Sequence, residues 1–239
     1  MLVLVVETVA LWHNFRSQLL NLIFPPRCVG CHQTGAWLCA ECMSRIPPVE
    51  PPVCIRCGDK VSANELCVRC HTSPLQIESI RSIVYFEGVL RDAMHSFKYR
   101  GRTVLAEPLG ALMAEYWMQY PMPIDIVTPV PLHAARLRER GYNQAALLAH
   151  EMARRAGLVV DERVLVRQRA TTSQTKLDAG QRKKNVNAAF RCSSNELTGK
   201  HVLLIDDVCT TGATLEACAV ALHDGGARSV QALTLARAR

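Results

Sequence analysis

The stretch Val202–Thr214, which reads VLLIDDVCTTGAT, decides the fold predicted for this chain. Apolar residues lead into two adjacent carboxylates, Asp206 and Asp207, and a turn rich in threonine and glycine follows them. The pattern predicts a buried parallel strand that ends at the two aspartates, then a loop and a new helix. Such a turn presents backbone N–H groups and a helix N-terminus, which together bind anions.

The residue types in the turn favour a sugar phosphate as the anion. Glycine lets the backbone approach a phosphate closely, and the threonines add hydroxyl donors. Two neighbouring carboxylates suit ribose hydroxyls and a Mg²⁺ ion rather than the phosphate itself. An ordinary strand-to-helix turn without a ligand is the alternative interpretation. The predicted phosphate-binding residues are Thr210, Thr211, Gly212, Ala213 and Thr214.

The composition indicates one domain of ordinary size with a small appendage. The chain has 239 residues, 49% of them hydrophobic, and a net charge of +7, which permits an anionic partner without requiring one. Residues 1–24 predict an amphipathic helix. They have no basic flank, and Glu7 interrupts the apolar run, so we expect neither a secretory signal nor a membrane span.

Cysteine spacing predicts two metal sites near the N-terminus. Of the eleven cysteines, eight fall in C-x2-C pairs between Cys28 and Cys70. Two such pairs complete a closed tetrahedral S₄ site, the geometry of structural Zn²⁺. We expect sequential ligand sets, although interleaved sets, disulfides and redox-active pairs are alternatives. Metal-bound thiolates point to a reducing compartment, hence a cytoplasmic protein. The predicted ligands are Cys28, Cys31, Cys39, Cys42, Cys54, Cys57, Cys67 and Cys70.

The rest of the chain alternates strands with helices, which predicts an α/β fold with a mainly parallel sheet flanked by helices. Three regions are expected: residues 1–24, a double zinc ribbon over 25–75, and an α/β domain over 76–239. Prolines at 47, 48, 51 and 52 predict a stiff linker between the cysteine clusters. The expected strands are Ile80–Phe86, Asp125–Pro129, Val164–Val166, Ala189–Cys192, Val202–Ile205 and Ser229–Leu235. The expected helices are Val89–Phe97, Thr103–Tyr120, Asn143–Ala156 and Thr214–His223.

Two basic segments are candidates for binding a pyrophosphate. Arg136, Arg138 and Arg140 follow the rigid turn after the strand at Pro129, and arginine suits bidentate phosphate contacts. Lys176 and Arg182 lie in a long polar loop, a kind of segment that is often a functional lid. A solvated basic face is the alternative interpretation of these charges.

Several motifs together make this chain similar to the ComF family. They are FPPRCVGC from Phe24 to Cys31, FKYRG from Phe97 to Gly101, PVPLHAARLRERGYNQA from Pro129 to Ala145, QTKLDAGQRKKNVNAAF from Gln174 to Phe190, and the 202–214 stretch. The last resembles the phosphoribosyl pyrophosphate (PRPP) motif of type I phosphoribosyltransferases. The resemblance implies a double zinc ribbon, a type I phosphoribosyltransferase domain, and an association with the uptake or use of extracellular DNA.

Two functions follow from this resemblance. In the first, a phosphoribosyltransferase with an unidentified acceptor uses Asp206, Asp207, Lys176 and Arg182 in catalysis, with Mg²⁺ and PRPP bound by the turn and the arginine triplet. In the second, a non-enzymatic accessory protein binds single-stranded DNA through its zinc ribbons and the two basic segments, mainly at backbone phosphates, and its pocket senses phosphate. Proteins of DNA uptake are possible partners in either case.

Overall fold

The computed structural model describes residues 25–63, 65–168, 189–193 and 197–239. The predicted N-terminal helix over residues 1–24 and the candidate residues Lys176 and Arg182 lie outside the described residues. In the described part of the chain, no helix is both long and apolar enough to cross a membrane.

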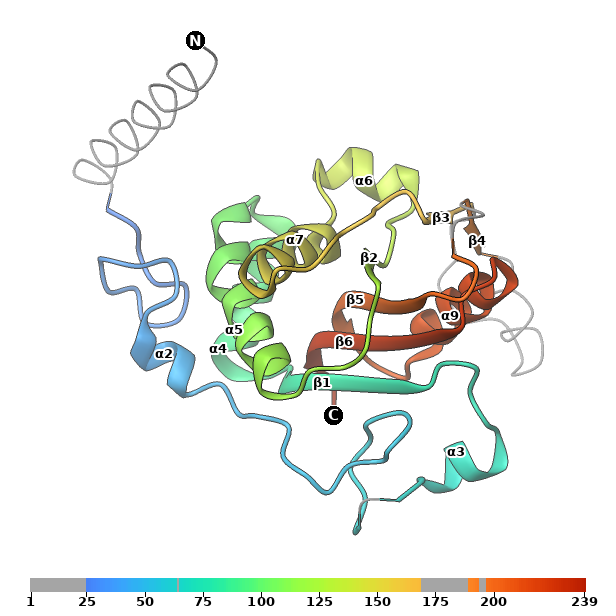
Figure 1. Ribbon diagram of the computed structural model, residues 1–239. Helices are drawn as coiled ribbons and strands as arrows, with labels where there is room; N and C mark the ends of the chain where they lie inside the picture. Colours follow the sequence, from blue (N-terminus) through green and yellow to red (C-terminus); the bar gives the residue numbers. More distant parts are fainter. Residues whose placement is uncertain (1–24, 64, 169–188, 194–196) are drawn as a thin grey trace, which may run out of the picture.

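A parallel sheet forms the centre of the α/β domain (Figure 1). Its strand order is β1-β6-β5-β2, so the strand that carries the two aspartates is an inner one. A separate antiparallel pair consists of β3 and β4. The mainly parallel sheet predicted from the sequence is therefore confirmed. The bounds are β1 Ser79–Tyr85, β2 Ile126–Pro129, β3 Leu165–Arg167, β4 Phe190–Cys192, β5 His201–Cys209 and β6 Ser229–Arg237.

Helices cover both faces of the sheet because its inner strands are apolar on both sides. Leu203 and Ile205 of β5 pack with α4 (Gly88–Tyr99), α5 (Ala106–Gln119) and α7 (Gln144–Ala156). Val202 and Leu204, which alternate with them, pack against α9 (Ala213–Asp224) on the opposite face. The result is a three-layer α/β sandwich. The described helices also include α6 (Ala134–Arg140) and a short 3-10 helix over Thr103–Leu105.

Local signals set the ends of α7 where the sequence placed them. The Asn143 side chain accepts a hydrogen bond from the Ala145 N–H and so caps the helix. Gly157 ends it in the left-handed conformation with φ 68°. Helix α6 was not predicted as an element, and it ends in the same way at Gly141 with φ 83°.

Strand β5 is longer than predicted, and this corrects the expectation that it ends at the two aspartates. It continues to Cys209 because β6 runs on to Arg237 and pairs with its last residues, Val208 with Ala236 and Cys209 with Arg237. Asp206 and Asp207 therefore lie within a strand. Successive residues of a strand point to opposite sides of the sheet, so the two carboxylates have different neighbours.

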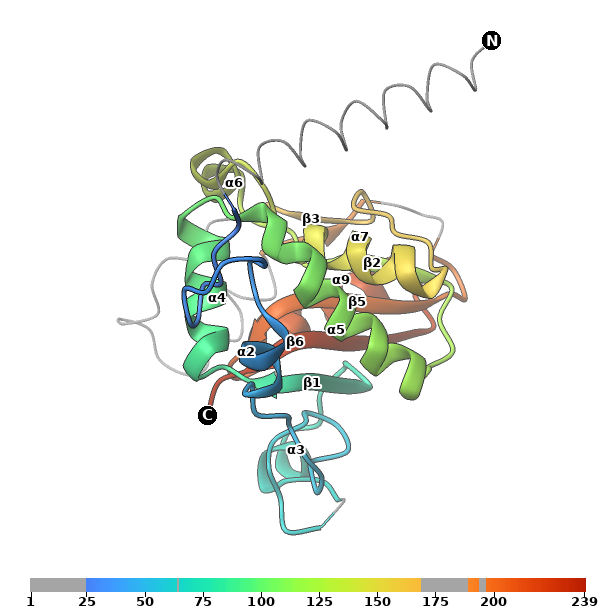
Figure 2. The ribbon, with the colours of Figure 1, turned by 90° about the vertical axis from the view of Figure 1, so that its left-hand side faces the viewer.

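The two cysteine clusters pack against the α/β domain, along the β1 edge of the sheet (Figure 2). Short helices α2 (Ala40–Ser44) and α3 (Val68–Thr72) belong to the first and second cluster. The proline-rich segment between them is not a free spacer. Its Val49 N–H donates to the Ile83 carbonyl, and its Pro47 carbonyl accepts from the Tyr85 N–H. It thus covers the unpaired edge of β1.

Candidate functional site

The bend after β5 has the form of an anion cup. Gly212 adopts φ 78°, a left-handed conformation that favours glycine, and a Cβ atom built there would lie 2.9 Å from Cδ1, the end of the Ile80 side chain. Helix α9 begins at the next residue, Ala213, whose N–H donates a 3.4 Å hydrogen bond to Oγ1 of Thr211. Thr210 and Thr214 are exposed beside it. The predicted phosphate-binding residues therefore lie together, at a helix N-terminus.

Asp207 forms an ion pair with a residue that the sequence analysis did not include in the site. Its carboxylate oxygens lie 2.9 and 3.0 Å from Nζ of Lys98, at the last turn of α4. Both side chains are largely buried, which makes this pair stronger than one on the surface. Lys98 is part of the FKYRG motif, which contributes to the family resemblance but was not predicted to belong to the site. Its role depends on a contact across 109 residues of sequence.

Asp206 lies in a different environment from its neighbour. Its Oδ1 accepts a hydrogen bond of 2.8 Å from the Asp207 N–H. Burial, and then the charge of Asp207, raise the pKa of Asp206 to about 7, against the opposing charges of Lys98 and Arg167. The Asp206 carboxyl is therefore partly protonated near neutral pH. A cation bound beside it would replace that proton.

A basic cleft of about 430 Å³ adjoins the ion pair of Asp207. Arg136 and Arg140 line it from α6, whereas Arg138 of the predicted triplet is not among its lining residues. The Arg140 guanidinium lies over the ring of Tyr99 with 5.4 Å to its centroid, and it donates a hydrogen bond to Gln144. Lys98 belongs to both the cleft and the ion pair, so it connects the arginines with the carboxylates. The complete lining is Lys98, Tyr99, Gly101, Arg136, Glu139, Arg140 and Tyr142.

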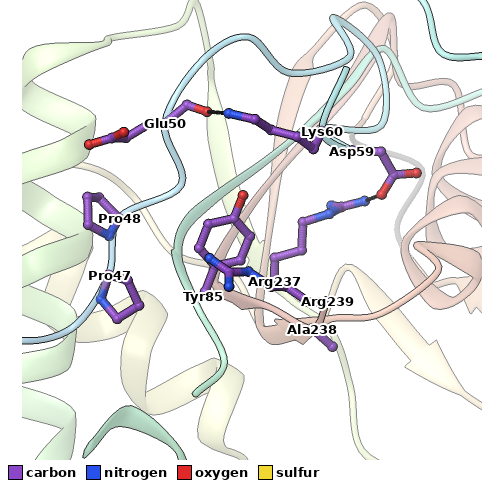
Figure 3. A pocket seen from close by; sticks show the side chains of 9 residues that line it. All are labelled: Pro47, Pro48, Glu50, Asp59, Lys60, Tyr85, Arg237, Ala238 and Arg239. Atoms are coloured by element: carbon purple, nitrogen blue, oxygen red, sulfur yellow. Dashed lines mark hydrogen bonds and ion pairs between the residues drawn. The ribbon is translucent and has the colours of Figure 1, made fainter. Parts of the chain in front are cut away.

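A larger cavity of about 730 Å³ lies elsewhere, between the proline-rich segment and the ends of β1 and β6 (Figure 3). Its charges are mixed, and none of the predicted phosphate-binding residues lines it. We therefore place the candidate site at the bend and the basic cleft. The lining of the larger cavity is Pro47, Pro48, Glu50, Asp59, Lys60, Tyr85, Arg237, Ala238 and Arg239.

The eight clustered cysteines form two separate groups, each made of sequential pairs. Within each group all Sγ atoms lie within 4.8 Å of one another. Cys31 and Cys39 are 3.7 Å apart, and Cys57 and Cys67 are 3.6 Å apart. Tetrahedral zinc with bonds of about 2.3 Å separates its sulfur ligands by about 3.8 Å. Both groups therefore fit Zn²⁺, with sequential rather than interleaved ligand sets.

Backbone donors prepare one thiol of each group for metal binding. The Cys39 N–H lies 3.4 Å from Sγ of Cys28, and the Cys67 N–H lies 3.3 Å from Sγ of Cys54. Although burial opposes it, such backbone donors lower the pKa of Cys28 and of Cys54 to about 6. Burial raises the pKa of Cys42 to about 12. Four such thiols ionise together only beside a cation, which a closed zinc site supplies.

Comparisons with known proteins agree with this architecture. The double zinc ribbon domain matches residues 19–71, and the phosphoribosyl transferase domain matches residues 140–239. The DNA utilization protein YhgH of Escherichia coli is 31% identical over 211 residues, covering 85% of this chain and 92% of that protein. Competence protein F of Haemophilus influenzae is 29% identical over 225 residues, covering 89% and 97%.

Two more comparisons extend the range of similar proteins. Competence protein ComFC of Bacillus subtilis is 29% identical over 211 residues, which is 84% of each chain. Among solved structures, a glutamine PRPP amidotransferase from B. subtilis complexed with ADP and GMP is 18% identical. It covers 59% of this chain and 30% of that chain, with a TM-score of 0.43.

Proposed function

This chain belongs to the ComF family of competence and DNA-utilisation proteins, and on that premise we propose that it binds PRPP, or a related sugar 5-phosphate, together with Mg²⁺. The bend at Thr210–Thr214 holds the 5-phosphate. Asp207 holds the ribose hydroxyls and the Mg²⁺ ion. Asp206, on the other side of β5, supports that position with its charge and with the hydrogen bond that its Oδ1 accepts from the Asp207 N–H. Arg136 and Arg140 receive the pyrophosphate in the basic cleft.

The observation that carries this proposal is the position of Lys98. Its ammonium pairs with Asp207 and also lines the cleft that contains Arg136 and Arg140. Lys98 thus connects the cations of the cleft with Asp207, three residues before the bend in the sequence. A phosphate cup, a carboxylate and cations are the three groups that a phosphorylated ribose with a pyrophosphate requires.

Phosphoribosyl transfer is the reaction that such an arrangement serves. The bond between C1 of the ribose and the pyrophosphate oxygen breaks, positive charge develops on the ribose ring, and the acceptor forms the new bond to C1. Cations that neutralise the departing pyrophosphate and carboxylates near the ring stabilise that transition state. Mg²⁺, when bound, adds charge neutralisation on the pyrophosphate. The acceptor is not identified, so transfer is proposed only as a class of reaction.

Calorimetric titration with PRPP, with and without Mg²⁺, tests the proposal. We expect Mg²⁺-dependent binding to the wild type. A double variant, Asp206→Asn with Asp207→Asn, should bind at least tenfold more weakly and lose its response to Mg²⁺. Glu115→Gln, which removes an exposed carboxylate from α5, is the matched control and should bind like the wild type. A wild type that binds neither PRPP nor ribose 5-phosphate would refute the proposal.

An alternative function, the handling of single-stranded DNA, is favoured by one side chain. Tyr99 is 67% exposed and lines the cleft together with Lys98 and Arg140, whose guanidinium lies over the tyrosine ring. Exposed aromatic rings beside cations stack on bases while the cations bind phosphates. Binding of an oligothymidine should then weaken steeply with added salt and weaken further in Tyr99→Ala. Binding without salt dependence would count against this function.

A further inference from the structure

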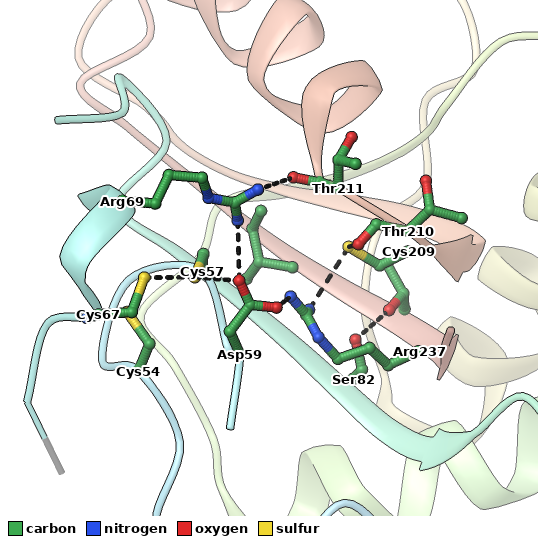
Figure 4. Close-up of polar contacts among 12 residues, drawn as sticks. Cys54, Cys57, Asp59, Cys67, Arg69, Ser82, Cys209, Thr210, Thr211 and Arg237 are labelled. Carbon is green, nitrogen blue, oxygen red and sulfur yellow. Dashed lines mark hydrogen bonds and ion pairs between the residues drawn. The ribbon is translucent and has the colours of Figure 1, made fainter. Parts of the chain in front are cut away.

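Arg69 connects the second cysteine cluster directly to the phosphate cup. Arg69 lies in α3, between the zinc ligands Cys67 and Cys70. Its Nη1 donates a 3.0 Å hydrogen bond to the main-chain carbonyl of Thr211, 142 residues away in sequence (Figure 4). Its Nη2 donates to Oδ2 of Asp59 at 3.1 Å. One guanidinium therefore joins the ribbon to the bend.

The other oxygen of Asp59 leads to the same bend by a second route. Oδ1 of Asp59 accepts a hydrogen bond from Arg237, whose side chain is buried. Nη1 of Arg237 lies 3.6 Å from Sγ of Cys209, the last residue of β5. Two arginines thus converge on one carboxylate and contact the chain immediately before and within the bend. Figure 4 shows both routes together.

The contact of Arg69 fixes the direction of one peptide group in the cup. In a trans peptide the carbonyl and the following N–H point in opposite directions. Because the Thr211 carbonyl points to Arg69, the Gly212 N–H points away from the ribbon. That N–H lies at the start of α9, where an anion binds. Rotation of this peptide would turn the carbonyl, an acceptor, toward the bound phosphate.

Metal binding to the second cluster holds Arg69 and Asp59 in place. The Asp59 main-chain carbonyl accepts a 2.7 Å hydrogen bond from the Cys54 N–H, so Asp59 is part of the loop that carries Cys54 and Cys57. Gly58 in that loop packs closely on the sheet, because a Cβ atom there would lie 2.7 Å from the Ile80 carbonyl. So small a ribbon keeps its conformation only while its metal is bound.

We propose that Arg69 is a positioning residue through which the second zinc site sets the conformation of the phosphate cup. The zinc site is thereby a regulator of ligand binding, not only a stabiliser of its own ribbon. This inference rests on the proposed function insofar as the ligand is PRPP. The coupling of the ribbon to the bend stands on the contacts alone.

Hydrogen exchange at the amides of residues 209–214 tests the coupling without any ligand. Arg69→Met removes the donors and keeps the length of the side chain. We expect it to retain the metal of both clusters, to speed exchange in the bend about tenfold, and to weaken PRPP binding about tenfold. Arg45→Met is the matched control: Arg45 follows the last ligand of the first cluster, is exposed, and pairs with Glu41. It should change neither quantity.

Two further samples, the variant Arg69→Lys and the zinc-free protein, separate the effect of the arginine's donor geometry from the effect of the metal. Arg69→Lys keeps the charge but cannot reach Asp59 and Thr211 with a fork of donors, so its exchange should lie between those of wild type and Arg69→Met. Removal of zinc by a chelator should speed exchange in the bend at least as much as Arg69→Met does. Restoring zinc should reverse the change in the wild type and not in Arg69→Met.

The outcomes distinguish this inference from the proposed function. Unchanged exchange in Arg69→Met, with its zinc retained, overturns the inference, whether or not the wild type binds PRPP. Faster exchange in a protein that does not bind PRPP supports the coupling and refutes the proposed function. Faster exchange with unchanged PRPP affinity overturns the claim that the zinc site regulates binding.

Discussion

At the scale of single residues, Asp206 and Asp207 show how far two adjacent carboxylates can differ. Asp207 points to α4 and pairs with Lys98, whereas Asp206 lies close enough to α9 to raise the pKa of the Cys218 thiol, after burial. The two side chains point to opposite faces because β5 continues beyond them. They are therefore not an equivalent pair, and the effects of their substitution should differ.

The first prediction concerns the pH dependence of stability. A carboxyl whose folded pKa is raised, as at Asp206 to about 7, stabilises the fold at low pH and loses that contribution as pH rises from about 4 to about 7. At about 1.4 kcal/mol per pKa unit, Asp206→Asn should therefore raise the free energy of unfolding at pH 8 by about 3–4 kcal/mol relative to its effect at pH 4. Urea denaturation without Mg²⁺ at both pH values measures this.

Asp161, a carboxyl whose pKa is shifted in the opposite direction, provides the control for that experiment. Hydrogen bonds from Arg163 lower the pKa of Asp161 against the effect of burial, so its contribution is present above pH 4 and is lost as pH falls. Asp161→Asn should then destabilise the protein at pH 8 and not at low pH. If Asp206→Asn has the same effect at both pH values, the raised pKa of Asp206 is wrong.

The second prediction concerns substitution of Gly212 by alanine, with Gly157 as a matched control. Alanine at Gly212 must adopt a left-handed conformation and displace the end of the Ile80 side chain, so Gly212→Ala should shift the bend and weaken PRPP binding. Gly157→Ala requires the same backbone conformation but meets open space. It should cost about 1 kcal/mol of stability and leave binding unchanged. Calorimetry and thermal melting together separate the two effects.

At the scale of elements, the zinc ribbons provide a prediction of metal content. The wild type should contain two zinc ions per chain, one for each cysteine group. Cys42→Ser should contain one, and its first ribbon should lose its structure because so small a segment folds around its metal. Cys218→Ser, which changes a buried cysteine of α9 outside both groups, should keep two. Elemental analysis of purified protein decides this.

Whether the end of an element could be predicted depended on which residues set that end. The ends of α7 followed from Asn143 and Gly157, because a cap is a property of neighbouring residues. The end of β5 could not be found in the same way. It is set by β6, which supplies partners for Val208 and Cys209 from a segment more than 20 residues later. Apolar runs locate a strand, but its partner determines its length.

At the scale of the whole molecule, the ribbons protect the exposed edge of the sheet. The proline-rich segment hydrogen-bonds to β1 at Ile83 and Tyr85, and the second ribbon contacts it at Ile80. An uncovered edge strand is a template for pairing with another chain. Chelation of zinc should therefore cause self-association as well as loss of metal.

Light scattering coupled to size exclusion measures that association directly. We expect the mass of the particle to increase in chelator and to return when zinc is added before aggregation. Unchanged mass in a chain shown to be free of metal would mean that the proline segment covers β1 without help from the ribbons.

The sequence by itself determined the α/β class, the two groups of four cysteines and the turn after β5, because each depends on spacing within a few residues. Only the tertiary structure decided that Lys98 pairs with Asp207, that Asp206 faces another side, and that Arg69 holds the Thr211 carbonyl. These contacts join residues more than 100 positions apart. They arise from strand order and from the docking of the ribbons, and neither leaves a periodic signal in the sequence.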